Sequence, residues 1–307
     1  MKRLLLLGGL LLFAVPASAA RRPLPAQDWW PVYSPDGAKI AFTRVAFPSG
    51  AMTLEVVDLA KHRTTRIAAN QGQLSPSWSS DGKLAFSLGG KIYTSNANGT
   101  GRVRITSQGR SFAPAWRPHS TDIAYLTTAG AQNTDLWVSG ALWARNAIGK
   151  PAWSPDGTEL AFDRDDGVYV TTGPGAERKI ATANEPRVPV WSPDGTKIAY
   201  VASRRISVVP SDGSATPSAA SASFAVMSDP SWTHSGTAIV YTAGTALLRT
   251  TFGAGTVRLA ASSGAGASAS PVNATIAFAA PLPVCRHSAI RLYSPSGRIS
   301  TASGSCG

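Results

Sequence analysis

Hydrophobic and polar positions alternate along this chain in a block that returns about every forty residues. Its fullest copy reads Trp-Ser-Pro-Asp-Gly at residues 153–157 and Leu-Ala-Phe at residues 160–162. Seven copies, some of which keep only part of the phrase, end on Phe42, Phe86, Tyr125, Phe162, Tyr200, Tyr241 and Phe278. The steps between them are 44, 39, 37, 38, 41 and 37 residues. A strand-forming unit with this period is typical of a β-propeller.

The fourth copy shows how one repeat makes one blade. Its Ser-Pro-Asp-Gly stretch suits a type I turn between two antiparallel strands. Leu160 and Phe162 then share one face, and Ala161 points to the other, where a neighbouring sheet can approach. Residues 168–170 and 178–180 supply a third and a fourth strand. We therefore predict an all-β chain with a single propeller of seven four-stranded blades. Six blades is the alternative if residues 276–278 complete an earlier sheet.

The ends of the repeat array are less regular. Residues 218–224 and 260–270 are rich in Ala, Ser and Gly, which predicts loops. Blade seven is expected to use residues 290–293 and 298–299 as strands. Residues 23–31, which include two tryptophans, are expected to add a strand to the last blade or to pack on it.

Residues 1–19 have the three parts of a secretory signal. A basic start precedes an apolar stretch at residues 4–15 and an Ala-Ser-Ala cleavage site at residues 17–19. A membrane anchor is the alternative, but the apolar stretch is shorter than the roughly 20 residues that span a bilayer. We predict a secreted or periplasmic protein, without stable membrane insertion after cleavage, whose residues 20–307 form one propeller domain.

Charge and cysteines fit an exported chain. The formal charge is +12, and its lysines and arginines are scattered among turns without forming a run. This distribution favours a solvated surface over an anion-binding one and predicts no nucleic-acid partner. The two cysteines, Cys285 and Cys306, fall in the last repeat, and a disulfide there would fasten the closing blade. Two free thiols are the alternative.

The Trp-Ser-Pro-Asp-Gly-x-x-Ile-Ala-Phe phrase resembles the WD40-like repeat of TolB-type propellers, which also occurs in prolyl-oligopeptidase-like peptidases. The resemblance covers nearly all of the chain after residue 19 and implies the fold. It does not imply one function, because these residues make turns and blade contacts and one fold carries many functions. TolB has a separate α/β domain and six blades, and the peptidases have a hydrolase domain, so neither function transfers whole.

Residues that would carry catalysis are hard to find in this sequence. Among the four histidines, His119 and His234 occupy turn positions, so the histidine-ringed metal of TolB-like lyases is not expected. Four aspartates recur as turn residues, one per repeat: Asp36, Asp81, Asp156 and Asp194. The acidic stretch at residues 163–167 lacks the order of a calcium loop. There is no Gly-x-Ser-x-Gly elbow, phosphate loop or dinucleotide fingerprint. We predict no cofactor and name no catalytic residue.

One candidate binding constellation remains. Arg110, Lys150 and Arg187 lie shortly before the tryptophans of three consecutive repeats, in segments expected to surround the mouth of the channel. They are predicted to receive a carboxylate or an acidic peptide end, the alternative being ordinary solvated charges.

These observations favour an exported, non-catalytic propeller that binds a protein, a peptide or a small anionic ligand at one face of the ring. A carbohydrate-active or other hydrolytic enzyme is the main rival, and a scaffold of the cell envelope is a third possibility. An enzyme would need two or more carboxylates converging in the channel. The sequence leaves the ligand and the oligomeric state open.

Overall fold

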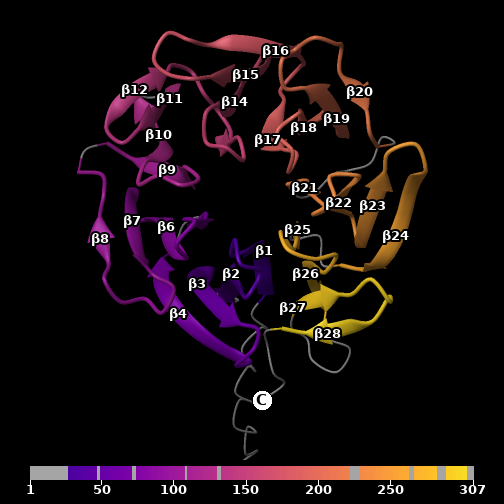
Figure 1. The fold of residues 1–307 in the computed structure, drawn as a ribbon. Coiled ribbons are helices and arrows are strands. Elements are labelled where there is room, and N and C mark those ends of the chain that lie inside the picture. The colour runs from indigo at the N-terminus through magenta and orange to yellow at the C-terminus, as the bar shows by residue number, and fades with distance from the viewer. Residues whose placement is uncertain are drawn as a thin grey trace, which may run out of the picture.

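The structure is a computed structural model, and it describes residues 27–46, 49–70, 74–107, 109–129, 133–221, 229–262, 266–281 and 288–302. These residues form strands and turns, which assemble into seven four-stranded sheets around a ring (Figure 1). The predicted all-β propeller with seven blades is confirmed. The alternative of six blades is wrong, because residues 276–278 do not complete an earlier sheet; they lie in a strand of a separate, seventh sheet of four strands.

Each blade consists of four consecutive antiparallel strands, the first innermost in the ring and the last outermost. Blade one contains β1 (Gln27–Tyr33), β2 (Lys39–Ala46), β3 (Ala51–Asp58) and β4 (Arg63–Asn70). Blade two contains β5 (Ser77–Trp78), β6 (Lys83–Leu88), β7 (Lys91–Asn96) and β8 (Val103–Arg104). Blade three contains β9 (Ser111–Trp116), β10 (Ile123–Ala129), β11 (Asn133–Val138) and β12 (Ala141–Ala144).

The remaining four blades follow the same order. Blade four contains β13 (Ala152–Trp153), β14 (Leu160–Arg164), β15 (Gly167–Thr171) and β16 (Arg178–Thr182). Blade five contains β17 (Arg187–Trp191), β18 (Lys197–Ala202), β19 (Arg205–Pro210) and β20 (Ser218–Ala219). Blade six contains β21 (Ser231–Trp232), β22 (Ala238–Ala243), β23 (Ala246–Thr251) and β24 (Gly255–Ala261). Blade seven contains β25 (Ala267–Ala269), β26 (Ile276–Pro281), β27 (Ser288–Tyr293) and β28 (Ile299–Thr301).

Neighbouring blades pack large residues against a small one, as the alternation along the second strands predicts. Leu160 and Phe162 lie in one buried cluster with Ala124 of blade three, and Ala161 lies in another with Tyr200 of blade five. Seven such clusters join the blades, and their small members are Ala41, Ala85, Ala124, Ala161, Ala199, Val240 and Ala277. Buried aromatic rings remove apolar surface from water at every joint.

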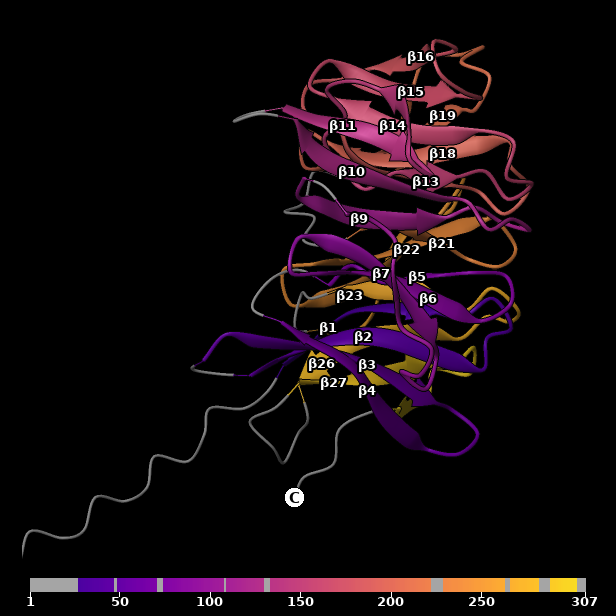
Figure 2. The same ribbon diagram turned by 90° about the vertical axis from the view of Figure 1, so that its left-hand side faces the viewer.

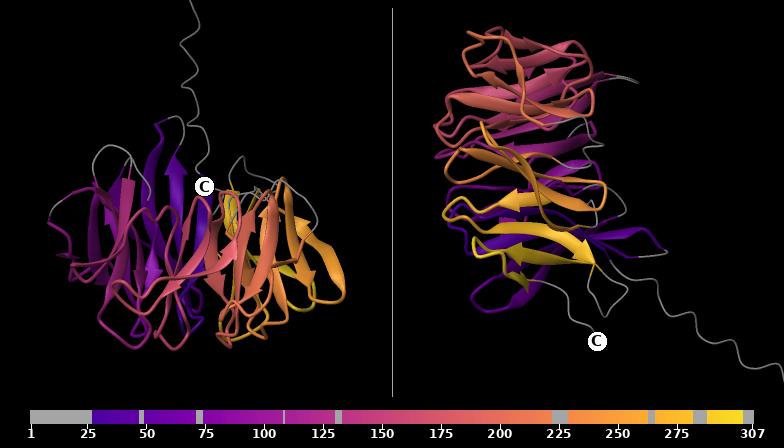
Figure 3. Two further views of the ribbon diagram at one scale, coloured as in Figure 1. Left: turned by 90° about the horizontal axis from the view of Figure 1, so that it is seen from above. Right: turned by 90° about the vertical axis from the view of Figure 1, so that its right-hand side faces the viewer.

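The strands run from one face of the ring to the other (Figures 2 and 3). Because the Ser-Pro-Asp-Gly turns join the first strand of a blade to the second, they all lie on one face, called here the turn face. The connections into the innermost strands, such as residues 145–151, lie on the opposite face, called here the entry face. Any site made by these connections therefore belongs to the entry face.

The recurring turn aspartates serve their own turns. In each, a serine hydroxyl donates to the aspartate two residues later at 2.5–2.6 Å. This hydrogen bond is the largest of the effects that lower the pKa of these carboxyl groups below its usual value. The four aspartates are Asp36, Asp81, Asp156 and Asp194. Their role as turn residues agrees with the sequence.

One expectation about the ends of the array is confirmed only in its second form, packing on the last blade, and another is corrected. Residues 27–33 form β1, the innermost strand of blade one, because they pair with β2 rather than joining blade seven; β1 does pack against β26 of that blade. Residues 260–270 are not loop throughout, since β24 runs to residue 261 and β25 spans 267–269. The proposed signal at residues 1–19 and both cysteines, Cys285 and Cys306, lie outside the described residues.

Candidate functional site: the central channel

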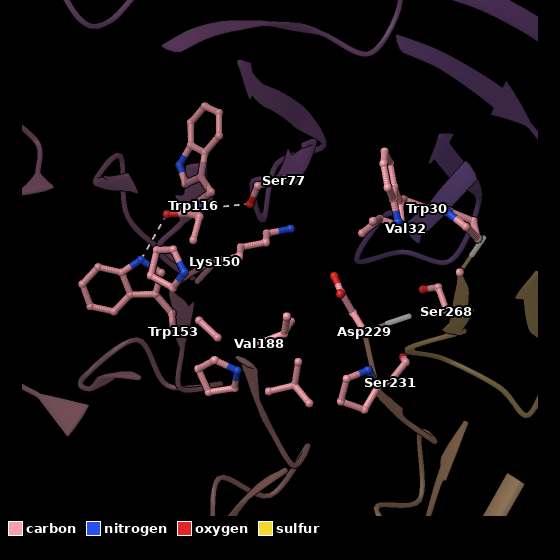
Figure 4. Close-up of a pocket in the computed structure, with 18 of the residues that line it drawn as sticks. Trp30, Val32, Ser77, Trp116, Lys150, Trp153, Val188, Asp229, Ser231 and Ser268 are labelled. Atoms are coloured by element: carbon pink, nitrogen blue, oxygen red, sulfur yellow. Dashed lines mark hydrogen bonds between the residues drawn. The ribbon is translucent and has the colours of Figure 1, made fainter. Parts of the chain in front are cut away.

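The centre of the ring contains a cavity of about 310 Å³, and residues from the beginnings of all seven blades line it (Figure 4). Tryptophan, proline, alanine and valine side chains make up most of the wall, with a few serines. Lys150 and Asp229 are the two charged members among the described residues of the lining. An apolar concave site with a few placed polar groups is the usual form of a ligand site.

One position of the repeat supplies both charges. It is the third residue before the aromatic of the turn phrase, and in six blades a proline follows it. In blade order the position holds Trp30, Ser75, Ala113, Lys150, Val188, Asp229 and Gly266. The proline has no N–H, so it suits an innermost edge strand that has no further strand to pair with. The charged pair therefore sits at one level of the channel, in blades four and six.

The backbone at this position is unusual in several blades. Trp30 and Val188 have φ values of 50° and 53°, in the left-handed region that β-branched and bulky residues rarely adopt. Both coincide with bulges, where the pairing of β1 with β2 and of β17 with β18 shifts register. Bulges re-aim side chains, and here these two line the channel.

Lys150 extends from blade four towards blade two. Its Nζ donates to the carbonyl oxygen of Pro76 at 3.3 Å, across the intervening blade three. The surrounding protein replaces water around the ammonium and lowers its pKa, while the negative charge of Asp229 acts in the opposite direction. Burial likewise raises the pKa of Asp229, and the charge of Lys150 opposes that rise. Each residue thus helps to keep the other ionised.

A buried acid holds the segment that leads to Lys150. Asp163 in β14 is fully buried, and its Oδ2 accepts a hydrogen bond from the backbone N–H of Gly149 at 3.0 Å. Its carbonyl oxygen accepts a second one from Ile148, also at 3.0 Å. Burial raises the pKa of Asp163 to about 7, although the Gly149 N–H and the charge of Arg187 lower it. Asp163 therefore fixes the two residues that precede the channel lysine.

The three predicted cations all occur where the chain enters an innermost strand on the entry face, but their surroundings differ. Lys150 lines the channel. Arg110 is exposed and borders a separate depression with Gly90 and Phe112. Arg187 is exposed and forms an ion pair with Glu185 at 4.0 Å. Neither arginine is among the residues that line the channel cavity.

Sequence reasoning missed Asp229 and Asp163. Asp229 could have been found from the register, because it precedes Pro230 as Lys150 precedes Pro151. Asp163 follows the Leu-Ala-Phe segment at a position that holds Thr43 in blade one, and nothing local signals its burial. Within the described ranges, no group of three or more His, Cys, Asp or Glu residues is placed to hold a metal ion. Nor is there, in that part of the chain, a helix suited to crossing a membrane.

Comparison with known proteins places this ring among propellers. No family model matches the chain. A protein TolB homolog from Chlorobium chlorochromatii (strain CaD3) is 33% identical over 102 residues, which are 32% of this chain and 23% of that relative. The match therefore spans about a quarter of the relative's length.

Two solved structures resemble the whole ring. An acylaminoacyl peptidase from Pyrococcus horikoshii superposes with a TM-score of 0.64 at 10% identity, over 91% of this chain and 52% of that one. An oligogalacturonate lyase in complex with manganese superposes with a TM-score of 0.63 at 14% identity, over 87% of this chain and 89% of that one. At such identities these likenesses show the fold alone. The chain is thus a β-propeller, and a stretch of 102 residues in it is similar to TolB homologues.

Proposed function

We propose that this chain is an exported, non-catalytic propeller that binds a protein or peptide partner, or a small anionic ligand, at the entry face. The observation that carries the proposal is the position of Lys150, the one cation among the described residues that line the channel. The likeness to a TolB homolog and the ring of seven blades support a binding role. Arg110 and Arg187 are proposed to extend the positive rim outside the channel.

The channel favours an anionic group for a physical reason. Protein surrounds Lys150, so its charge is screened less than a surface charge would be. Its ammonium donates to the neutral Pro76 carbonyl, which an incoming carboxylate would replace with a stronger, charge-assisted partner. Apolar walls next to Lys150, including Trp116 and Trp153, would cover the rest of the bound group.

A hydrolytic enzyme is the competing proposal. Acid and base catalysis by a carboxylate pair needs two such groups near the substrate. Asp229 is the single carboxylate among the described channel-lining residues, and Asp163 is buried beside the channel without lining it. This arrangement supports binding rather than hydrolysis.

Export is part of the proposal. With residues 1–19 removed as a secretory signal, the propeller of residues 20–307 would work in the periplasm or outside the cell, where Cys285 and Cys306 would form a disulfide. Mass spectrometry of the purified mature protein, alkylated without reduction, tests both points. Mature protein that begins near residue 20 and carries no alkylated cysteine is expected. A retained N-terminus, or alkylation of both cysteines, would contradict the proposal.

Titration calorimetry with short peptides tests the binding role. The probes are acidic, neutral and basic hexapeptides, each with a free or an amidated C-terminus. Acidic peptides with a free C-terminal carboxylate should bind best, and added salt should weaken their binding. Lys150→Met, and the triple replacement of Arg110, Lys150 and Arg187 by alanine, should weaken binding about tenfold or more. The control Lys61→Met changes an exposed lysine on the turn face and should have no effect. Equal binding of acidic and basic peptides would refute the proposal.

A further inference from the structure

Lys150 and Asp229 form a charge pair built by the repeat. Each directly precedes a proline that leads into an innermost strand; the two strands are two blades apart, and both charged residues line the channel. Figure 4 shows the two side chains pointing into the same cavity from different blades. A ligand in this cavity meets an ammonium and a carboxylate at one level.

The fold restrains the two segments that carry these charges. Lys150 donates to the carbonyl oxygen of Pro76, which belongs to blade two. Pro151 and Pro230, directly after the two charged residues, restrict the backbone on either side. The surrounding protein shifts the pKa values of both groups towards their neutral forms, and the charge of each group opposes the shift of the other.

The rest of the cavity limits the size and polarity of what it can hold. Its volume of about 310 Å³ lies at the small end of the range for small-molecule sites. Trp30, Trp116 and Trp153 contribute broad apolar surfaces to the wall. A ligand that fits is small, carries one negative and one positive group, and has an apolar body.

We propose that the channel binds a free α-amino acid with an apolar side chain, its carboxylate on Lys150, its ammonium on Asp229 and its side chain against the tryptophan and proline wall. The proposal rests on the binding role proposed above and deepens it, because it names the ligand class of the same channel. An anion site would need Lys150 alone; the amino-acid site needs Asp229 as well.

The experiment compares leucine with two analogues that each lack one charge. Titration calorimetry is run with leucine, 4-methylpentanoate, which lacks the amino group, and 3-methylbutylamine, which lacks the carboxylate. Leucine should bind about tenfold or more tightly than either analogue. Isoleucine, phenylalanine and methionine extend the series. Leucyl-leucine, whose two charges are farther apart, should bind more weakly than leucine.

Variants of the two charged residues test which group of the ligand each one binds. Lys150→Met should bring the affinity for leucine down to that for 3-methylbutylamine. Asp229→Asn should bring it down to that for 4-methylpentanoate, while the affinity for 4-methylpentanoate itself should hold or rise. Lys61→Met and Asp212→Asn change exposed charges on the turn face and should leave both affinities unchanged. Thermal melting of each variant establishes that it is folded before it is titrated.

The outcomes separate the two proposals. Equal binding of 4-methylpentanoate and leucine, with no loss in Asp229→Asn, would overturn the amino-acid site and leave the anion-binding role intact. Tighter binding of leucyl-leucine than of leucine, or no binding by any of the four amino acids, would overturn the amino-acid site as well. Failure of the acidic hexapeptides together with all of these small ligands would remove both proposals.

Discussion

Trp153 donates its indole N–H to the carbonyl oxygen of Ala115 at 3.1 Å, across the joint between blades three and four. Three other joints have the same bond: Trp78 to Val32, Trp191 to Ala152, and Trp232 to Val190. The remaining three joints have serine at the accepting position, and its hydroxyl accepts a backbone N–H of the next blade: Ser77 from Trp116, Ser231 from Ala269, and Ser268 from Tyr33. One innermost-strand position thus links every pair of neighbouring blades, including the first and the last.

Removing one indole N–H should weaken one joint. Trp153→Phe keeps most of the ring but leaves the Ala115 carbonyl without its donor, at an expected cost of about 1–3 kcal/mol in the free energy of unfolding. Trp153→Ala also opens a cavity in the buried cluster and should cost roughly 3–5 kcal/mol. Urea unfolding measures both.

Trp116→Phe is the matched control. Its indole donates to Ser120 within its own blade, and the joint uses its backbone N–H instead, which the substitution leaves in place. Trp116→Phe should therefore cost less than Trp153→Phe. Equal costs would show that the indole bond across the joint does not stabilise the ring.

The sequence predicted the ring well because its signals are local and repeated. A large-small-large segment such as residues 160–162 sets which face meets which neighbour, and the adjacent turn sets the direction of the next strand. The channel was harder to predict. The position that holds Lys150 is visible in the repeat, but whether it faces the channel depends on the bulges and the curvature of the whole ring. The burial of Asp163 likewise arises from a connection that folds over it.

The ion pairs of Arg44 in blade one should stabilise the protein much more than exposed ion pairs do. It contacts Asp28 and Glu55 at 2.7 Å each, and both of these carboxylates are buried. Arg44→Met would leave two buried negative charges without their cation, at an expected cost of roughly 3–5 kcal/mol. Lys83→Met removes an exposed pair with Asp81 and should cost below about 1 kcal/mol. Similar denaturation midpoints for the two variants would contradict this assignment.

Gly149 should tolerate no side chain. A Cβ at this residue would overlap the carboxyl group of Asp163, which lies against it. Gly149→Ala should therefore displace the segment before Lys150 and lower the unfolding free energy by about 1–3 kcal/mol. Gly173→Ala, where no atom lies within 4 Å of the new Cβ, is the control and should be close to neutral. A Gly149→Ala protein as stable as the control would mean that Asp163 and this segment are not closely packed in solution.

Asp163 should make the protein less stable as the pH rises. Its pKa is about 7 in the folded state, against about 3.9 for an unfolded chain. Between these values the folded state keeps a proton that the unfolded state has lost, so the free energy of unfolding falls with rising pH until about pH 7. The full difference corresponds to roughly 2–4 kcal/mol. In Asp163→Asn, the amide oxygen can still accept the hydrogen bond from the Gly149 N–H, but the side chain does not titrate. The free energy of unfolding of this variant should therefore fall less between pH 5 and pH 8 than that of the parent protein. Other groups that titrate in this interval are common to both proteins and cancel in the comparison. Urea unfolding of both proteins at several pH values measures the difference, and parallel profiles would show that Asp163 is ionised without penalty in the folded protein.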